Sequence, residues 1–174
     1  MKTENIENYL NSFGKYIVKQ SRTNLTKGKK NVNKSLYNSI NFKITKDNNG
    51  FTIQFFMNSY GTFVDKGVSG NEEKQSYKDY TGKNKTSPYS YKSKQPPSRA
   101  LDKWIVKRGI APRDEKGRFI SRKSISFLIA RSIKAKGIKS TSFFQRPMQL
   151  GLETFGKDIL KAIKEDVLKE LNKK

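Results

Sequence analysis

The chemistry open to this chain is limited first by two residue types that it lacks, His and Cys. Their absence excludes disulfides, thiolate nucleophiles, Cys/His zinc sites and imidazole acid–base catalysis. Asp and Glu together number 15, and their spacing shows neither a paired-carboxylate site nor a metal site. No glycine-rich phosphate loop of the usual spacing is present either. We therefore expect no catalytic residues, no cofactor and no metal, and an enzyme such as a basic nuclease is the least favoured class.

The basic residues favour binding over catalysis. Lys and Arg number 37 against 15 acids, which gives a net charge of +22. Such a balance implies a polyanion, or a neighbouring protein that supplies the opposite charge. A genome rich in A and T would favour Lys over Arg. It would not favour bases over acids, because Glu codons are also rich in A.

One group of bases falls on a predicted helix that begins after Ser121, a suitable N-cap, and ends at Gly137. Its apolar stripe is expected at Ile125, Leu128, Ile129 and Ile133. Two interpretations of the basic face stay open: a solvated surface, or a surface turned towards DNA phosphates or an acidic neighbour. No acid lies between its bases, which are Arg122, Lys123, Arg131, Lys134 and Lys136.

Residues 68–97 show no periodicity, and a structureless loop of this length is unusual inside a compact domain. Tyrosines offer rigid contact area, which argues against a simple linker. We favour an arm that orders against a neighbouring subunit, then plain disorder, then stacking on nucleic-acid bases. The four tyrosines of this segment are Tyr77, Tyr80, Tyr89 and Tyr91.

Helical periodicity marks both ends of the chain. Residues 3–20 are predicted to form a helix with Thr3 as N-cap, and the polar residues 21–34 a flexible connection. A short helix after Pro97 would place the lone Trp104 in the core. A helix of about 25 residues is expected to begin near Pro147. The expected buried residues are Ile6, Leu10, Phe13 and Ile17 in the first helix, and Met148, Leu152, Phe155, Ile159, Ile163, Val167 and Leu171 in the last.

Alternating apolar residues predict a β-hairpin between these helices, with strands at 36–45 and 51–58. The turn would lie at Asp47–Gly50, whose residues tolerate positive φ. One face is expected to pack against the terminal helices. Phe56 breaks the alternation, which suggests a second strand covered on both faces near its end. The expected buried residues include Ile40, Phe42, Ile53 and Phe55.

Two short stretches frame the segment 68–97. Residues 58–67 are interpreted as a strand that leaves the sheet into a corner, and residues 142–147 as a strand that leads into the last helix. The first carries the pattern Tyr-x-x-Phe-Val-Asp-x-Gly, and the second carries Phe-Phe-x-Arg-Pro. Their residues are Tyr60, Phe63, Val64, Asp65 and Gly67, then Phe143, Phe144, Arg146 and Pro147.

In this order, the elements and the two patterns resemble the tail-completion and neck proteins, the small head–tail joining subunits of tailed bacteriophages. That family tends to have Tyr-Ala-x-Tyr/Phe-Val-Glu-x-Gly-Thr after a hairpin, and Pro-Phe-Leu-Arg-Pro-Ala before a last helix. Here Gly61 stands at the usual Ala. The resemblance implies a single α+β domain. It comprises a hairpin-based sheet packed by the N-terminal helix and the long C-terminal helix, with two shorter helices between.

The resemblance also implies a structural virion protein without a catalytic site. Identical subunits would form a ring, a hexamer or a dodecamer, at the head–tail junction, against portal, connector or tail-tube proteins. DNA would pass through the ring without sequence-specific contact. The alternative is a monomeric basic protein that binds nucleic-acid phosphates without sequence specificity. Neither a signal peptide nor a membrane span is visible in the sequence, so assembly in the host cytoplasm is expected.

Overall fold

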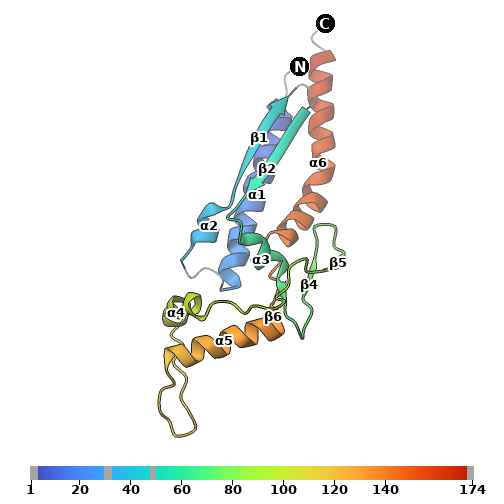
Figure 1. Ribbon diagram of the computed structural model, residues 1–174. Coiled ribbons are helices and arrows are strands. Elements are labelled where there is room, and N and C mark those ends of the chain that lie inside the picture. Colours follow the sequence, from blue (N-terminus) through green and yellow to red (C-terminus); the bar gives the residue numbers. More distant parts are fainter. Residues whose placement is uncertain (1–3, 30–32, 48–49, 172–174) are drawn as a thin grey trace. The chain divides into compact units, whose positions relative to one another are not determined.

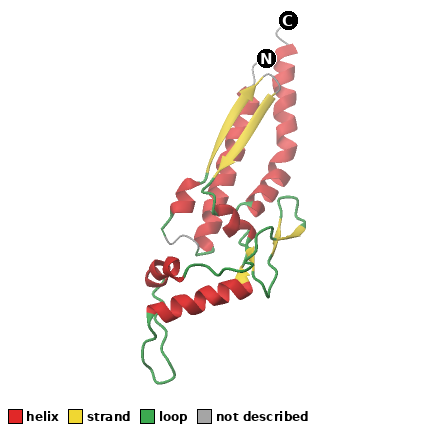
Figure 2. Cartoon of the chain, in the orientation of Figure 1, coloured by secondary structure: helices red, strands yellow, loops and turns green. Residues whose placement is uncertain are grey.

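The computed structural model describes residues 4–29, 33–47 and 50–171, and it mixes helices and strands as predicted (Figures 1 and 2). The chain forms two compact units. Unit 1 consists of the chain up to Gly61, residues 78–83 and the chain from Phe143. Unit 2 consists of Thr62–Tyr77 and Asn84–Ser142. The single α+β domain expected from the sequence stays a prediction.

Helix α1 (Glu4–Lys27) opens unit 1 and buries the four apolar residues predicted for its face. It continues well beyond residue 20, so the prediction of a flexible connection is wrong as far as Lys27. Ser21 and Leu25 are fully buried and extend the same face at intervals of four residues. The polar composition of this stretch concealed that spacing. The expected N-cap Thr3 lies outside the described residues.

Helix α6 (Gln145–Leu171) packs along α1 in unit 1 (Figure 1). The Phe155 ring lies 5.7 Å from the Tyr9 ring and 5.6 Å from the Phe13 ring, centroid to centroid. A Cβ on Gly151 would lie 2.7 Å from Ile17 Cδ1, so a larger residue there would require the Ile17 side chain to shift. The predicted stripe is wrong in part, because Ala162 and Asp166 are the buried residues in the second half of α6. Four of its members are exposed: Leu152, Ile163, Val167 and Leu171.

Strands β1 (Asn41–Asp47) and β2 (Gly50–Phe56) pair antiparallel, with Phe42 opposite Phe55, which confirms the hairpin. The Phe55 ring contacts those of Phe13 and Phe144, at 6.3 and 5.5 Å between centroids. The predicted strand start is wrong, because residues 35–39 form the short helix α2 (Ser35–Ser39). Two apolar residues four apart fit a helix as well as a strand. Phe56 is 49% exposed, so the expected cover on both faces of β2 is also wrong.

The two stretches that frame the segment 68–97 are not strands. Residues 61–66 form the short helix α3 (Gly61–Lys66), and residues 140–144 lack regular structure before α6 begins. The segment itself contains three short strands, contrary to expectation: β3 (Val68–Ser69), β4 (Ser76–Lys78) and β5 (Asn84–Thr86). Strand β3 pairs with β6 (Gly137–Ile138), and β4 pairs with β5. Backbone pairing therefore organises a segment whose side chains show no periodicity.

Helices α4 (Ser98–Lys107) and α5 (Arg122–Lys136) pack together in unit 2. Ser121 Oγ accepts a hydrogen bond from Ser124 N at 3.1 Å, which confirms the predicted cap. The expected core position of Trp104 is wrong, because Ile105 is the buried residue and Trp104 is 37% exposed. The α5 stripe is also shifted: Leu128 is exposed, whereas Ile125, Ser126 and Ala130 are buried. Within the described ranges, no helix has both the length and the apolar character that a membrane crossing needs.

Candidate motif junction and nucleic-acid interface

The first of the two sequence patterns ends at a position that requires glycine. Gly67 has φ +75°, a backbone conformation that residues other than glycine rarely adopt. A Cβ there would lie 2.7 Å from both Ile138 O and Ser140 N, which are backbone atoms. At the Ala-to-Gly departure, a Cβ on Gly61 would lie 2.6 Å from Met57 Sδ and 2.9 Å from Leu36 Cδ1. Backbone approach and positive φ thus explain Gly67, whereas a Cβ on Gly61 would meet only the ends of two flexible side chains.

The residues that precede the second pattern cap the C-terminal end of α3. Thr141 Oγ1 donates to Val64 O at 2.7 Å, and Ser142 N donates to Asp65 O at 2.9 Å. These bonds satisfy carbonyls that a helix end leaves without an intrahelical partner. Asp65 itself is 2% exposed. We refer to this set of contacts as the motif junction. Sequence reasoning missed Thr141 and Ser142, because neither residue type nor spacing distinguishes them from loop residues.

The residues of the second sequence pattern lie mostly in the core of unit 1. Phe143 is fully buried, Pro147 is buried, and Phe144 packs on the hairpin through Phe55. Arg146 alone is exposed. In the first pattern, Tyr60 and Phe63 are 41% and 42% exposed. The exposed members are therefore the ones available to a partner, and the others maintain the fold.

Three of the four segment tyrosines pack within unit 2. The Tyr89 ring lies 4.4 Å from that of Phe63, and Lys66 Nζ lies 5.8 Å from the Tyr77 ring centroid. Tyr91 N donates to Ser69 O at 2.8 Å, and burial raises the pKa of the Tyr91 phenol.

The remaining tyrosine, Tyr80, belongs to unit 1. Its backbone N donates to Gln145 Oε1 at 2.9 Å, while the residue is 51% exposed. Of the four tyrosines singled out from the sequence, Tyr80 is the one that presents most of its surface to a neighbour.

The predicted basic residues of α5 divide between two directions. Lys123, Arg131 and Lys134 follow one another at intervals of eight and three residues, so they share one side of the helix with Phe127. Phe127 is 50% exposed, which places an aromatic ring within a row of cations. Lys136 is exposed near the C-terminal end of α5. We call Lys123, Phe127, Arg131 and Lys134 the α5 row.

Arg122 points elsewhere, because its Nε lies 3.8 Å from Asp102 Oδ1 of α4. Between the N-terminal halves of these two helices is an open groove with a volume of about 590 Å³. Sequence reasoning missed its two α4 bases, Arg99 and Lys103. Their spacing of four residues on one helix was the signal that could have found them. We call this cavity the α4–α5 groove. Its lining residues are Ser98, Arg99, Asp102, Lys103, Arg122, Lys123 and Ser126.

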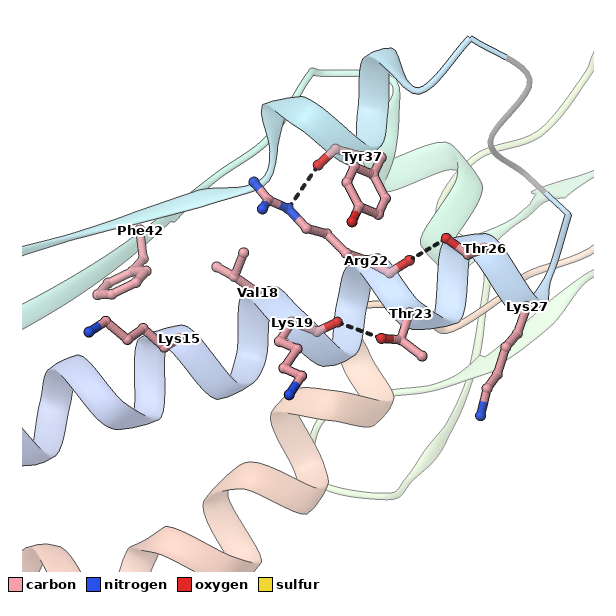
Figure 3. Close-up of a pocket in the computed structure, with 9 residues that line it drawn as sticks. All are labelled: Lys15, Val18, Lys19, Arg22, Thr23, Thr26, Lys27, Tyr37 and Phe42. Atoms are coloured by element: carbon pink, nitrogen blue, oxygen red, sulfur yellow. Dashed lines mark hydrogen bonds between the residues drawn. The ribbon is translucent and has the colours of Figure 1, made fainter.

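A second basic groove, with a volume of about 670 Å³, lies along α1 in unit 1 (Figure 3). Its central cation has a structural role: Arg22 donates from Nε to Tyr37 O at 3.0 Å and from Nη2 to Ile40 O at 2.9 Å. Arg22 thereby fixes the end of α2 against α1. Lys19 and Lys27 extend from the same helix in Figure 3. Nothing in the sequence patterns had singled out this surface.

Among the described residues, no three acidic side chains gather as a metal site would require. Comparisons with protein-family models, with curated proteins and with solved structures give no match to this chain.

Proposed function

We propose that the protein is a structural subunit of the bacteriophage neck or tail-completion complex, forming a ring through which DNA passes. The observation that carries this proposal is the motif junction. Gly67 and the carbonyls of Val64 and Asp65 meet the strand β6 and the residues just before Phe143. The two short sequence patterns that carry the family resemblance thus adjoin one set of contacts, the motif junction. Exposed Tyr60, Phe63 and Arg146 then offer surface to neighbouring subunits or virion proteins.

The mass of the purified full-length chain tests this proposal. Native mass spectrometry at micromolar concentration should show one closed assembly, and electron microscopy should show a ring with a central channel. Hexamers and dodecamers are the expected stoichiometries. A chain that stays monomeric over this range, both alone and with DNA, would contradict the ring.

A second candidate function is monomeric, sequence-independent binding of nucleic acid. The α5 row favours it, because cations interleaved with an exposed aromatic ring suit a phosphodiester chain. Replacing Arg122, Lys123, Arg131 and Lys134 together with Gln should flatten the salt dependence of DNA binding. Affinities for unrelated sequences should agree within a few-fold. A preference of orders of magnitude for one sequence would indicate a sequence-specific protein instead.

A further inference from the structure

The arginines of this chain are concentrated in one part of unit 2. Of eight arginines, six lie between residues 99 and 131. A preference for Lys over Arg, which the rest of the chain shows, does not explain this cluster. Arginine binds phosphate through a planar fork of donors, whereas lysine acts as a compact point charge. The concentration is therefore typical of a surface that binds phosphate groups. The six residues are Arg99, Arg108, Arg113, Arg118, Arg122 and Arg131.

The charge of this part of the chain is equally one-sided. Residues 84–142 contain 16 bases and three acids, a net charge of +13 (16 minus 3) out of the +22 of the whole chain. Two of the three acids are already engaged with arginines: Asp102 with Arg122 at 3.8 Å, and Asp114 with Arg118 at 3.0 Å. A neighbouring polyanion would thus meet little opposing charge on this unit.

The packing of α4 on α5 brings four of these bases to one groove. Ile105 of α4 and Ile125 of α5 are buried, and the N-terminal halves of both helices border the α4–α5 groove. Arg99 and Lys103 line it from α4, and Arg122 and Lys123 line it from α5. The positive ends of the two helix dipoles reinforce these side chains but do not by themselves define the site. Asp102 holds the Arg122 guanidinium beside the groove.

The groove continues into the α5 row through Lys123, which belongs to both. From Lys123 to Lys134 the row extends over about 16 Å along the helix. A single small anion would occupy one end of such an array. A linear polyanion would satisfy all of it, and the exposed Phe127 in the middle offers a surface to sugars or bases.

We propose that the α4–α5 groove binds the phosphodiester backbone of nucleic acid, with Arg99, Lys103 and Arg122 as phosphate ligands and the α5 row as its extension. This proposal rests on the nucleic-acid contact of the proposed functions and adds the site, including two residues that sequence reasoning did not identify. Every residue named lies within unit 2, so the groove is formed by a single chain.

The test compares two double variants of the full-length chain that remove the same charge. R99Q/K103Q removes the α4 bases of the groove, and K107Q/K116Q removes two exposed bases of unit 2 elsewhere. Binding to a labelled 30-base-pair duplex of mixed sequence is measured by fluorescence anisotropy between 50 and 300 mM salt. R99Q/K103Q should raise the Kd about tenfold or more at 100 mM salt and lower the salt slope by about 1.8, the value for two lost phosphate contacts.

The control K107Q/K116Q should stay within about twofold of the unchanged protein at every salt concentration. Equal losses in the two variants would show binding to diffuse charge and would overturn the proposal. Unchanged binding by R99Q/K103Q, or no binding by the unchanged protein at 50 mM salt, would overturn it as well. Thermal unfolding of each variant separates lost contacts from lost structure. Native mass spectrometry of the same samples reports ring formation separately, so failure of the ring and failure of the groove are distinguishable.

A second arm identifies the form of the nucleic acid. F127A is tested with the duplex and with a 30-nucleotide single strand. A single-stranded ligand should lose affinity through lost base stacking, whereas a duplex contacted through its phosphates should be affected little. Either result supports the groove when R99Q/K103Q weakens the same ligand. If R99Q/K103Q weakens neither ligand, the groove is not the site.

Discussion

The free-energy cost of a side chain at the motif junction can be measured by comparing Gly67 with a second glycine of positive φ, Gly109. Gly67 and Gly109 both have positive φ, at +75° and +63°. They differ in space: a Cβ at Gly67 would meet backbone atoms at 2.7 Å, whereas a Cβ at Gly109 would meet nothing within 4 Å. The pair therefore separates conformational cost from steric cost.

We expect Gly109→Ala to lower the free energy of unfolding by about 1–2 kcal/mol, the cost of a left-handed conformation. Gly67→Ala should cost roughly 1–3 kcal/mol more, because β6 or the residues after it must move. Urea unfolding of both variants measures the difference. Equal effects would contradict the close approach at the junction.

Asp166 is a buried acid of α6 whose hydrogen bonds indicate a structural role. It is 2% exposed, and its carboxylate accepts from Asn5 Nδ2 at 2.8 Å and from Ile6 N at 3.1 Å. A residue of the last helix thus caps the first turn of α1. Asp166→Ala should destabilise the protein by about 1–3 kcal/mol, because a buried backbone donor loses its partner. Glu165→Ala, at the neighbouring exposed position, is the matched control and should change stability little.

Tyr9 gives unit 1 a dependence on alkaline pH. Its hydroxyl donates to Phe155 O, and its pKa is raised above 10.0 by burial and, secondarily, by the negative charge of Asp158. The protonated phenol is favoured in the folded state, so its contribution to stability is complete below pH 10. It is lost as pH rises through the higher folded-state pKa. The stability difference between the unchanged protein and Tyr9→Phe should therefore fall above pH 10. A difference independent of pH from 8 to 12 would contradict this assignment.

At the scale of elements, periodicity correctly predicted those helices and strands that bury a single apolar face. The hairpin and the first helix followed from alternation and from intervals of three and four residues. The extension of α1 to Lys27 was hidden because its buried contacts use Ser21 and one leucine. The α6 stripe was misjudged for a different reason: the second half of α6 buries Ala162 and Asp166, and larger apolar residues beside them remain exposed. Pattern alone does not reveal how near a partner helix lies.

The tyrosine segment divides into packed and exposed residues, and this division makes a prediction about assembly. Tyr89 packs on Phe63, so Tyr89→Ala should destabilise unit 2 by about 1–3 kcal/mol. Tyr80 is 51% exposed, so Tyr80→Ala should leave stability within about 0.5 kcal/mol yet reduce ring formation. Native mass spectrometry at matched concentrations checks the second effect. A Tyr80→Ala protein that assembles like the unchanged chain would contradict a role for Tyr80 between subunits.

At the scale of the whole molecule, the division into two units was beyond sequence reasoning. Unit 1 gathers three separate stretches of chain, and unit 2 gathers two. The concentration of arginine and of net positive charge in residues 84–142 does not by itself locate the changes at residues 61, 77, 83 and 142. The α5 bases were recognisable from the sequence, but the groove was not, because only packing brings Arg99 and Lys103 beside Arg122. Chemistry that depends on one element is visible in a sequence, whereas chemistry shared by two elements requires their packing.

The cap that Asp166 provides to α1 has a consequence for biosynthesis. The two partners are 160 positions apart, so the first helix leaves the ribosome long before the residue that completes its N-terminus. Until then the apolar face of α1 lacks α6, while residues 62–142 are already available to form unit 2. Domains generally fold as they emerge, and long-range contacts form late. Unit 1 is therefore expected to close only after α6 has been synthesised. A chain released early would expose the face of α1, and truncation before residue 166 should yield an aggregation-prone product.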